Sequence, residues 1–260
     1  MHRLKIRFLL LVVCVLFCQV TNGLLAAQTA TVEKVTLSED PWPPYILGEE
    51  GRAPTGGIAV DVLKRVFKNL SITLEMQLYP WQRSLYLVRE GREDGHMLLV
   101  KSPSWDQYMV YSVPFIDDRF LLWSKKSEPV ALGWQSFTEL VPYSIGITHH
   151  YSYGEQFEQA RQQLPLSLSG AKTDELNFKL LLGGRIDAFI CLEKVANAIF
   201  QRNPSLRNRF VAAEKPIETL SLYMSLHKDS AAVKLMPLIN QQLTELKHSG
   251  EIEKIIKNYH

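Results

Sequence analysis

Carboxylate, indole and phenol side chains gather near the start of the chain in one short segment, Glu39-Asp40-Pro41-Trp42-Pro43-Pro44-Tyr45. Three prolines in four positions cannot take part in a sheet ladder or a helix, so the segment is predicted to be stiff and extended. A stiff segment holds the rings of Trp42 and Tyr45 in place at little entropic cost. With the negative charge of Asp40 beside them, these side chains could contact a small molecule.

Two elements must position this segment. Apolar and polar residues alternate from Val35 to Ser38, which predicts a strand before it. Gly56 and Gly57 release the chain into a helix after it. The apolar face of that helix is predicted to consist of Ile58, Val62, Leu63, Val66 and Phe67. Open α/β sheets bind small molecules at the carboxyl ends of such strands, so the segment is predicted to form part of a binding site.

The chain continues as an alternation of strands and helices. Strands are predicted at 72–79 and 95–100, with a helix from Pro80 to about Gly91 between them. This order implies a parallel sheet with right-handed crossovers. The further predicted elements are a strand at 120–124, a short helix at 133–140, a strand at 143–148, helices at 152–163 and 173–182 (capped by Thr173), a strand entered at 183–190, a helix at 193–200, strands at 210–213 and 220–226, and helices at 231–248 and 252–256.

Several motifs, in order along the chain, resemble the family 3 periplasmic solute-binding proteins. The most specific is Tyr111-Ser112-Val113-Pro114-Phe115, which is similar to the family's Phe-Ser-x-Pro-aromatic run. The others are Gly57-Ile58-Ala59-Val60-Asp61, Pro80-Trp81-Gln82-Arg83-Ser84-Leu85, Glu90-Gly91-Arg92-Glu93-Asp94-Gly95, Gly183-Gly184-Arg185-Ile186-Asp187-Ala188, and Leu246-x-x-Ser249-Gly250-x-Ile252-x-x-Ile255. The resemblance covers nearly all of residues 33–259.

The resemblance implies an α/β, two-lobed periplasmic binding protein fold of type II kind. Each lobe would be a mostly parallel sheet flanked by helices, with the ligand cleft between the lobes. Residues 31–125 would form the first lobe, 126–214 the second, and 215–260 the return to the first, with the first crossing at 125–129. Closure on a ligand needs contacts from both lobes. The predicted ligand contacts are Asp40, Trp42, Tyr45, Trp81, Arg83, Ser102 and Trp105 in the first lobe, and Thr148, His149, Tyr151 and Glu193 in the second.

Some of these residues have a second interpretation. Trp42 and Trp81 could be core aromatics, although a proline-stiffened segment favours the site for Trp42. Arg83 lies near a helix N-terminus, where it could bind an anion or remain a solvated surface arginine.

The stretch before Tyr111 departs from the family pattern. Amino-acid-binding members usually have Thr-x-x-Arg there, and the planar fork of that arginine pairs with the ligand carboxylate. This chain has Ser102-Pro103-Ser104-Trp105, and no arginine lies between Glu93 and Asp118. A ligand other than a standard α-amino acid is therefore expected: apolar, aromatic or cationic, the last through cation–π contact. Arg83 or Arg119 could still replace the lost charge.

Two positions of the second lobe also depart from the family pattern. The family's aspartate that holds an α-ammonium would fall at Leu192, and Glu193 stands one residue later. The family's Gly-Thr-(Ser/Thr) reads Thr148-His149-His150 here. Adjacent histidines point in different directions on most backbones, so neither a metal site nor a cofactor is expected.

The N-terminus has the features of a secretory signal peptide. Basic residues precede an apolar run from Phe8 to Phe17, and small residues follow. Cleavage is expected between residues 23 and 30, which leaves Cys191 alone and the formal net charge at −1 instead of +2. No intramolecular disulfide is then possible, and no nucleic-acid partner is expected. The predicted location is the periplasm, and an uncleaved anchor is the alternative.

The function predicted first is capture of a small polar or aromatic molecule by hinge closure, by a monomer that serves an ABC-type transporter or a sensor in the inner membrane. The second hypothesis is an enzyme on the same fold, since cyclohexadienyl dehydratases resemble these binding proteins. Glu193, Asp40 and Ser102 would be its candidate groups, but no nucleophile–base pair or carboxylate-pair spacing supports catalysis. The third hypothesis is that the protein is an orphan signalling receptor.

Overall fold

A computed structural model describes residues 32–149 and 151–259. The residues from Lys34 onward form one compact unit. The predicted signal peptide lies outside the described residues, and so does His150.

One continuous sheet runs through the described residues. Its ten strands include a path of eight in the order β2-β1-β3-β10-β5-β8-β6-β7. The bounds along this path are Thr73–Leu78, Lys34–Glu39, Gly95–Val100, Glu218–His227, Ile116–Lys125, Ala188–Leu192, Ser144–Thr148 and Ser167–Ala171. Two short strands lie off the path: β4 (Met109–Tyr111) pairs with β10, and β9 (Phe210–Ala212) pairs with β5.

The sheet has two parallel halves joined by antiparallel strands. In the first half, β1 pairs in parallel with β2 and with β3. In the second half, β6 pairs in parallel with β7 and with β8. Strands β10 and β5 run antiparallel to their neighbours and connect the halves. The predicted parallel order is confirmed, and each half has its own edge of carboxyl strand ends.

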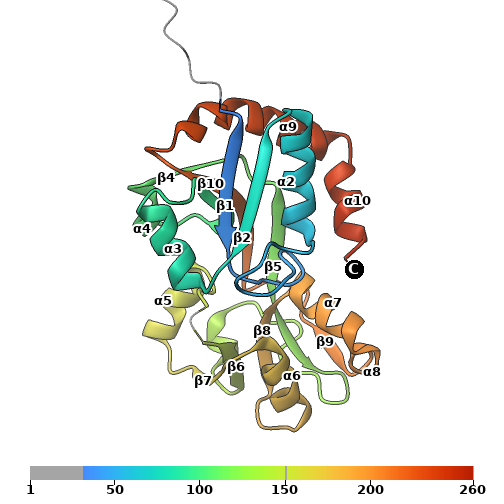
Figure 1. The fold of residues 1–260 in the computed structure, drawn as a ribbon. Helices are drawn as coiled ribbons and strands as arrows, with labels where there is room; N and C mark the ends of the chain where they lie inside the picture. The colour runs from blue at the N-terminus through green and yellow to red at the C-terminus, as the bar shows by residue number, and fades with distance from the viewer. Residues whose placement is uncertain (1–31, 150, 260) are drawn as a thin grey trace, which may run out of the picture. The chain divides into compact units, whose positions relative to one another are not determined.

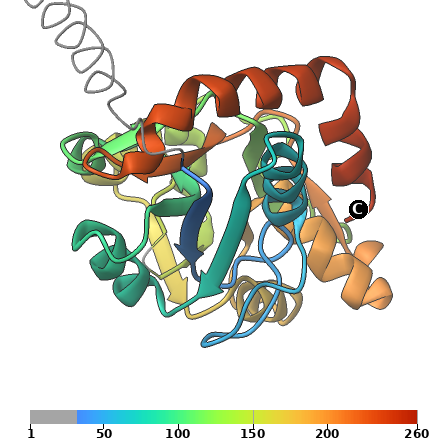
Figure 2. The ribbon, with the colours of Figure 1, turned by 45° about the horizontal axis from the view of Figure 1, so that its top comes forward.

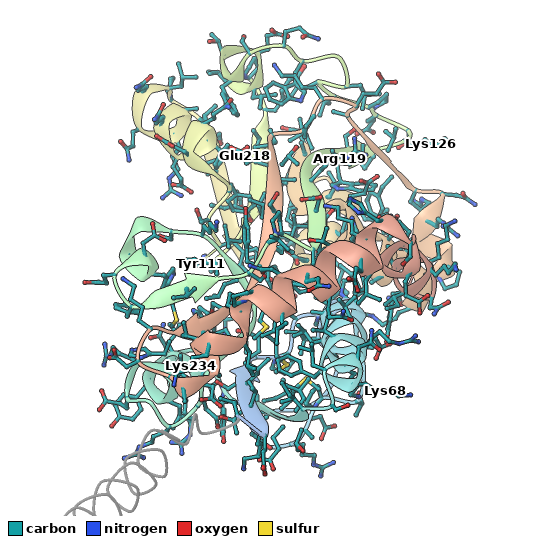
Figure 3. The ribbon with its side chains drawn as sticks, turned by 90° about the horizontal axis from the view of Figure 1, so that it is seen from above. Lys68, Tyr111, Arg119, Lys126, Glu218 and Lys234 are labelled. Atoms are coloured by element: carbon teal, nitrogen blue, oxygen red, sulfur yellow. The ribbon has the colours of Figure 1, made fainter. Side chains whose placement is uncertain are left out.

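Strand β5 belongs to both halves. Its residues 116–120 pair with β10, and its residues 120–124 pair with β8. The change of neighbours falls at Phe120, inside one strand that is longer than the predicted 120–124. Figure 3 labels Arg119 on β5 and Glu218 on the adjacent strand β10. The lobe boundaries given above remain predictions.

Four longer helices flank the first half: α2 (Ile58–Asn69), α3 (Trp81–Arg89), α9 (Met236–His248) and α10 (Glu251–Lys257). All the apolar positions predicted for α2 are buried, because their 3.6-residue spacing places them on one face. Helices α9 and α10 pack against α2 (Figures 1 and 2). A very short helix, α4 (Pro103–Asp106), follows β3.

The second half carries α5 (Glu155–Gln163), α6 (Asp174–Leu182), α7 (Glu193–Arg202) and α8 (Pro204–Arg207). Figure 1 shows α6 and α7 beside β8. The core here is strongly aromatic: the ring of Phe178 lies about 5 Å from those of Phe189, Phe200 and Phe210. Thr173 caps α6 as predicted, since its hydroxyl accepts a hydrogen bond from the Leu176 amide.

Some predicted elements differ in the structure. The helix expected at 133–140 is only a 3-10 turn, η1 (Phe137–Leu140), because a capping box of Ser136 and Glu139 starts it late. The helix expected at 231–248 is divided into η2 (Ala231–Leu235) and α9, with Pro237 in the first turn of α9. Strand β7 was not predicted, because Ser167–Ala171 lacks a clear apolar alternation.

Candidate functional site

The proline-rich segment is a tight turn and not the extended piece that its prolines predicted. The Trp42 carbonyl accepts hydrogen bonds from the amides of Tyr45 and Ile46, so the chain closes on itself. Its oxygens then meet the start of α2: the Pro44 carbonyl accepts from Ile58 and the Tyr45 carbonyl from Ala59. The prolines lack amide donors themselves, but their neighbours supply the bonds that close the turn.

Gly57 allows this close approach of turn and helix. Its φ is +119°, and a Cβ added there would lie 2.3 Å from the Tyr45 carbonyl oxygen. Only glycine combines that conformation with that space. The Gly57 amide also donates to the Tyr259 hydroxyl at 2.8 Å, which ties the turn to the C-terminal end of the chain.

The two predicted aromatic contacts of the turn lie differently. Tyr45 is 0% exposed, and its hydroxyl donates to the carboxylate of Asp118. Its predicted role as a ligand contact does not fit this structure, in which it supports Asp118 from the interior. Trp42 is half-buried, with its ring 4.9 Å from that of Tyr45. Its indole Nε1 is buried without a hydrogen-bond partner among the described residues, which leaves a donor available.

A row of aromatic rings lies along the carboxyl edge of the first half. The ring of Trp81 is 6.2 Å from that of Trp105, and Trp105 is 5.8 Å from Tyr108. Trp81 also contacts the imidazole of His96, at 5.5 Å. The structure thus brings Trp81 and Trp105 together, although they come from different elements. Both side chains are half-buried, so neither is a fully enclosed core residue.

The buried His96 and Glu39 lie behind Trp81, and the half-buried Asp40 follows Glu39 in the chain. Burial, with the Asp40 charge as the next cause, raises the pKa of Glu39 well above its usual value. Burial also raises the pKa of Asp40 to about 6 and lowers that of His96 to about 4. The His96 Nδ1 is 3.8 Å from Glu39, and both pKa shifts favour the uncharged forms of the two side chains, so burial acts against an ion pair here. Asp40 is then the carboxylate of this group that ionises near neutral pH.

The remaining predicted ligand contacts of the first half are Arg83 and Ser102. Arg83 is exposed, and its guanidinium lies 5.6 Å from the centre of the Tyr79 ring. Ser102 is the N-cap of α4, and its hydroxyl is 2.9 Å from that of Ser104. Both therefore remain predictions as ligand contacts.

Thr148, at the end of β6, is buried and fully engaged within the second half. Its amide donates to the Tyr153 hydroxyl at 2.6 Å, and its own hydroxyl donates to Asp174 at 2.5 Å. The position where the family pattern predicts an anion-binding amide and hydroxyl is thus occupied by the protein's own groups. Asp174 is the first residue of α6, and burial raises its pKa to about 6.

Tyr151 lies within electrostatic reach of both halves. Burial of its hydroxyl is the main cause of its raised pKa, and the negative charges of Asp174 and Asp40 add to it. The residue as a whole is 36% exposed, so its ring has an open side. Tyr151 therefore connects a carboxylate after β1 with one after β7. His149 is exposed, and its imidazole packs against Gly170 of β7.

A network of paired charges lies where β5 changes neighbours. Arg119 makes a forked contact with Glu193, with nitrogen–oxygen distances of 2.8–3.1 Å. Asp118 is buried and accepts from the amides of Arg119 and Lys194 as well as from Tyr45. The Lys194 ammonium is 3.8 Å from the same carboxylate. Glu193 thus binds Arg119, and Arg119 is not left over to pair with a ligand.

The structure brings Trp81 and Trp105 together and places Tyr151 in the field of Asp40, and it assigns Tyr45, Thr148 and Glu193 to internal pairs. Sequence reasoning missed Glu39, His96, Asp118 and Asp174. A histidine inside a buried apolar strand and an acid next to a helix cap were signals for His96 and Asp174. Nothing local pointed to Asp118.

Two features do not occur among the residues that the structure describes. No group of three or more His, Cys, Asp or Glu side chains is placed to hold a metal ion. Within residues 32–149 and 151–259, none of the helices has both the length and the apolar character needed to cross a membrane.

The chain has the two-lobed periplasmic binding protein fold: two parallel half-sheets share antiparallel strands in one sheet. Residues 35–260 match the model of the bacterial extracellular solute-binding proteins, family 3, and the chain belongs to that family. No curated protein sequence matches it.

Solved structures with this fold include transport and sensor domains. The second substrate-binding domain of GlnP from Lactococcus lactis, in its open conformation, is 20% identical with a TM-score of 0.68, over 87% of this chain and 95% of that one. A histidine kinase sensor domain is 18% identical with a TM-score of 0.68, over 87% and 95%. The periplasmic VFT2 domain of BvgS from Bordetella pertussis is 15% identical with a TM-score of 0.70, over 88% and 94%. At these identities the likeness is one of fold.

Proposed function

We propose that this protein captures a small molecule between its two lobes by hinge closure, for an ABC-type transporter or a sensor in the membrane. The observation that carries the proposal is strand β5, which pairs with β10 before Phe120 and with β8 after it. A strand shared in this way lets the lobes rotate about a short segment while each keeps its own core. Tyr151 of one lobe, in the field of Asp40 of the other, supports a ligand position between them.

The test is thermal unfolding of the mature protein against amino acids, aromatic acids, amines, short peptides and sugars. A ligand at about 100 times its Kd adds roughly 2.7 kcal/mol to the free energy of unfolding, which raises the Tm measurably. Trp105→Ala should abolish the rise, whereas Tyr86→Ala, an exposed aromatic residue on α3, should not. Failure of every compound class to raise the Tm would contradict the proposal.

We further propose that the protein is exported to the periplasm and acts as a monomer. The support is the extracellular family and the signal-peptide pattern of the first 30 residues. Mass spectrometry of the protein from a periplasmic fraction should give an N-terminus between residues 24 and 31, as expected from cleavage after residues 23–30. Retention of the full leader in the membrane fraction would favour an anchor.

An enzyme on the same fold is the second candidate. The observation that favours it is the adjacent pair Glu39 and Asp40, since carboxyl groups with raised pKa values often act in proton transfer. A dehydratase would use such a group to protonate a departing hydroxyl. Incubation with cyclohexadienyl acids, followed by the absorbance of aromatic product, tests this directly. Turnover that Asp40→Asn abolishes would favour the enzyme, and saturable binding without turnover would favour capture.

A further inference from the structure

We propose that the ligand is an organic cation without a carboxylate group, such as a primary amine, a guanidinium or a quaternary ammonium compound. Asp40 of the first lobe and Asp174 of the second would supply its counter-charges, and the rings of Trp81 and Trp105 its apolar contacts. This inference rests on the proposed function and specifies the ligand class of the same site.

The first argument is that three cationic side chains, those of Arg119, Lys194 and Lys101, already have partners within the protein. Arg119 is held by Glu193 in a forked ion pair, and Lys194 by Asp118. The Lys101 ammonium lies 4.4 Å from the centre of the Tyr223 ring and 5.4 Å from that of Tyr111. Releasing Lys194 to a ligand would leave the buried carboxylate of Asp118 without its cation, so Lys194 is not a ready partner for a ligand carboxylate. The fork of Arg119 is already filled by Glu193.

The second argument concerns backbone amides that could hold an anion. The Thr148 amide donates to Tyr153, and the Lys194 amide at the start of α7 donates to Asp118. The first amides of α2, those of Ile58 and Ala59, donate to carbonyl oxygens of the proline-rich turn. Anion sites at helix N-termini require free amides, and these are taken by the protein itself.

The third argument is that the site's own carboxylates lack such partners. Among the described residues, no Arg, Lys or His nitrogen lies within ion-pair distance of Asp40 or Asp174, although twelve other carboxylates have one. Asp174 is 7% exposed and accepts one hydrogen bond, from Thr148. A buried carboxylate without a counter-ion is unfavourable, and a bound cation would relieve this.

The fourth argument is the aromatic row. Trp81, Trp105 and Tyr108 form successive edge contacts, and the side chains of both tryptophans are only half-buried. An indole face attracts a cation, and Trp is the strongest of the aromatic residues in this respect. Carboxylates and indole faces together select positive charge, whereas indole faces alone would select any apolar ligand.

The experiment compares pairs of compounds that differ in one carboxylate: agmatine with L-arginine, cadaverine with L-lysine, and choline with glycine betaine. Phenylpyruvate and L-glutamine serve as anionic and neutral probes. Binding to the mature protein is measured by isothermal titration calorimetry. We expect the member without the carboxylate to bind at least tenfold more tightly than its partner in one or more pairs.

Variants then test the named residues. Asp40→Asn and Asp174→Asn should each weaken binding of the tightest-binding cation tenfold or more. The control is Asp229→Asn, because the side chain of Asp229 is 93% exposed, and it should leave that affinity unchanged. Trp105→Phe should retain more binding than Trp105→Ala. Arg83→Ala should have no effect on a cation. Far-ultraviolet circular dichroism shows whether each variant is folded. If an aspartate variant does not fold, the tryptophan variants still test the proposal.

The outcomes separate the two proposals. Tighter binding of L-arginine, L-glutamine or phenylpyruvate, lost in Arg83→Ala, would overturn the cation inference and leave capture of a small molecule standing. Binding of cations that Asp40→Asn and Asp174→Asn do not change would also overturn it. No binding of any compound in this set or in the wider panel would overturn both.

Discussion

Asp118 is buried and Asp40 is half-buried, and the partners of the two carboxylates differ. Asp118 is paired with Lys194 and accepts hydrogen bonds from Tyr45 and two backbone amides. Burial raises its pKa, but these partners act against the shift. Asp40 has no such cation, and burial raises its pKa to about 6. The difference assigns Asp118 to the internal contacts around β5 and leaves Asp40 without a cationic partner among the described residues, which supports the proposal that Asp40 meets a ligand.

The comparison predicts the largest effect at Asp118. Replacement by alanine leaves Lys194 and the Tyr45 hydroxyl without their shared partner, and removal of one member of a buried pair costs about 3–5 kcal/mol. Asp117→Ala is the matched control, because the side chain of this neighbour is 50% exposed and its ion pair with Lys247 is a surface pair. Urea denaturation measures both. Equal losses in the two variants would contradict the structural role of Asp118.

The next effect concerns Glu39, because burial raises the pKa of this carboxyl group and so favours its protonated form. Glu39→Gln keeps the shape and the neutrality, so the free energy of unfolding should change by less than about 0.5 kcal/mol. Glu39→Ala leaves the Leu98 amide without its acceptor and should cost about 1–3 kcal/mol. Urea denaturation of both variants checks this. A loss in Glu39→Gln as large as that in Glu39→Ala would mean that Glu39 is ionised.

Asp40 should make the stability of the ligand-free protein depend on pH. Its pKa rises from 3.8 to about 6 on folding, so the folded state keeps a proton that the unfolded state has lost. Stability from this group is therefore full below pH 3.8 and is lost as the pH rises to about 6. The acidic groups that act on it are Glu39 and Glu50, and Tyr151 lies in its field.

Asp40→Asn removes the titrating carboxyl group and with it this loss of stability at higher pH. The effect of the pKa shift is discounted because the side chain is partly exposed. The free energy of unfolding of the variant should then be about 1 kcal/mol higher at pH 7.5, or roughly 2–4 °C in Tm. Its stability should also depend less on pH between 4 and 6 than that of the unmodified protein. Differential scanning calorimetry at pH 4, 5, 6 and 7.5 gives both quantities. A lower Tm at pH 7.5 would show that Asp40 is paired in solution.

The smallest effect is expected at Arg119. Its forked contact with Glu193 is well oriented, but the two side chains are 46% and 33% exposed. Exposed pairs contribute about 0–1 kcal/mol, so Arg119→Ala should change the free energy of unfolding by no more than that. Its effect on a cationic ligand should be a gain or none, since Glu193 is freed. Weaker binding of a cation in Arg119→Ala would argue against the assignment of charges made here.

Local patterns determined a large part of this fold. The apolar face of α2, the cap at Thr173 and the order of strands and helices follow from periodicity, capping and the positions of glycine and proline. These are interactions between residues a few positions apart, and the sequence displays them directly. The family motifs and the absence of an arginine between Glu93 and Asp118 are equally visible in the sequence. They were sufficient to place the chain in its family and to question an amino-acid ligand.

The tertiary structure alone decided how the charges and donors of the site are used. Tyr45 and Asp118 are 73 residues apart, and Arg119 and Glu193 are 74 apart, so no local pattern links them. The closing of the Thr148 position by Tyr153 depends on how the chain turns after β6. Residue type tells whether a side chain can donate, accept or carry charge, but packing determines which partner it meets. In this protein that packing occupies the anion-binding positions and leaves Asp40 and Asp174 without a cationic partner among the residues that the structure describes.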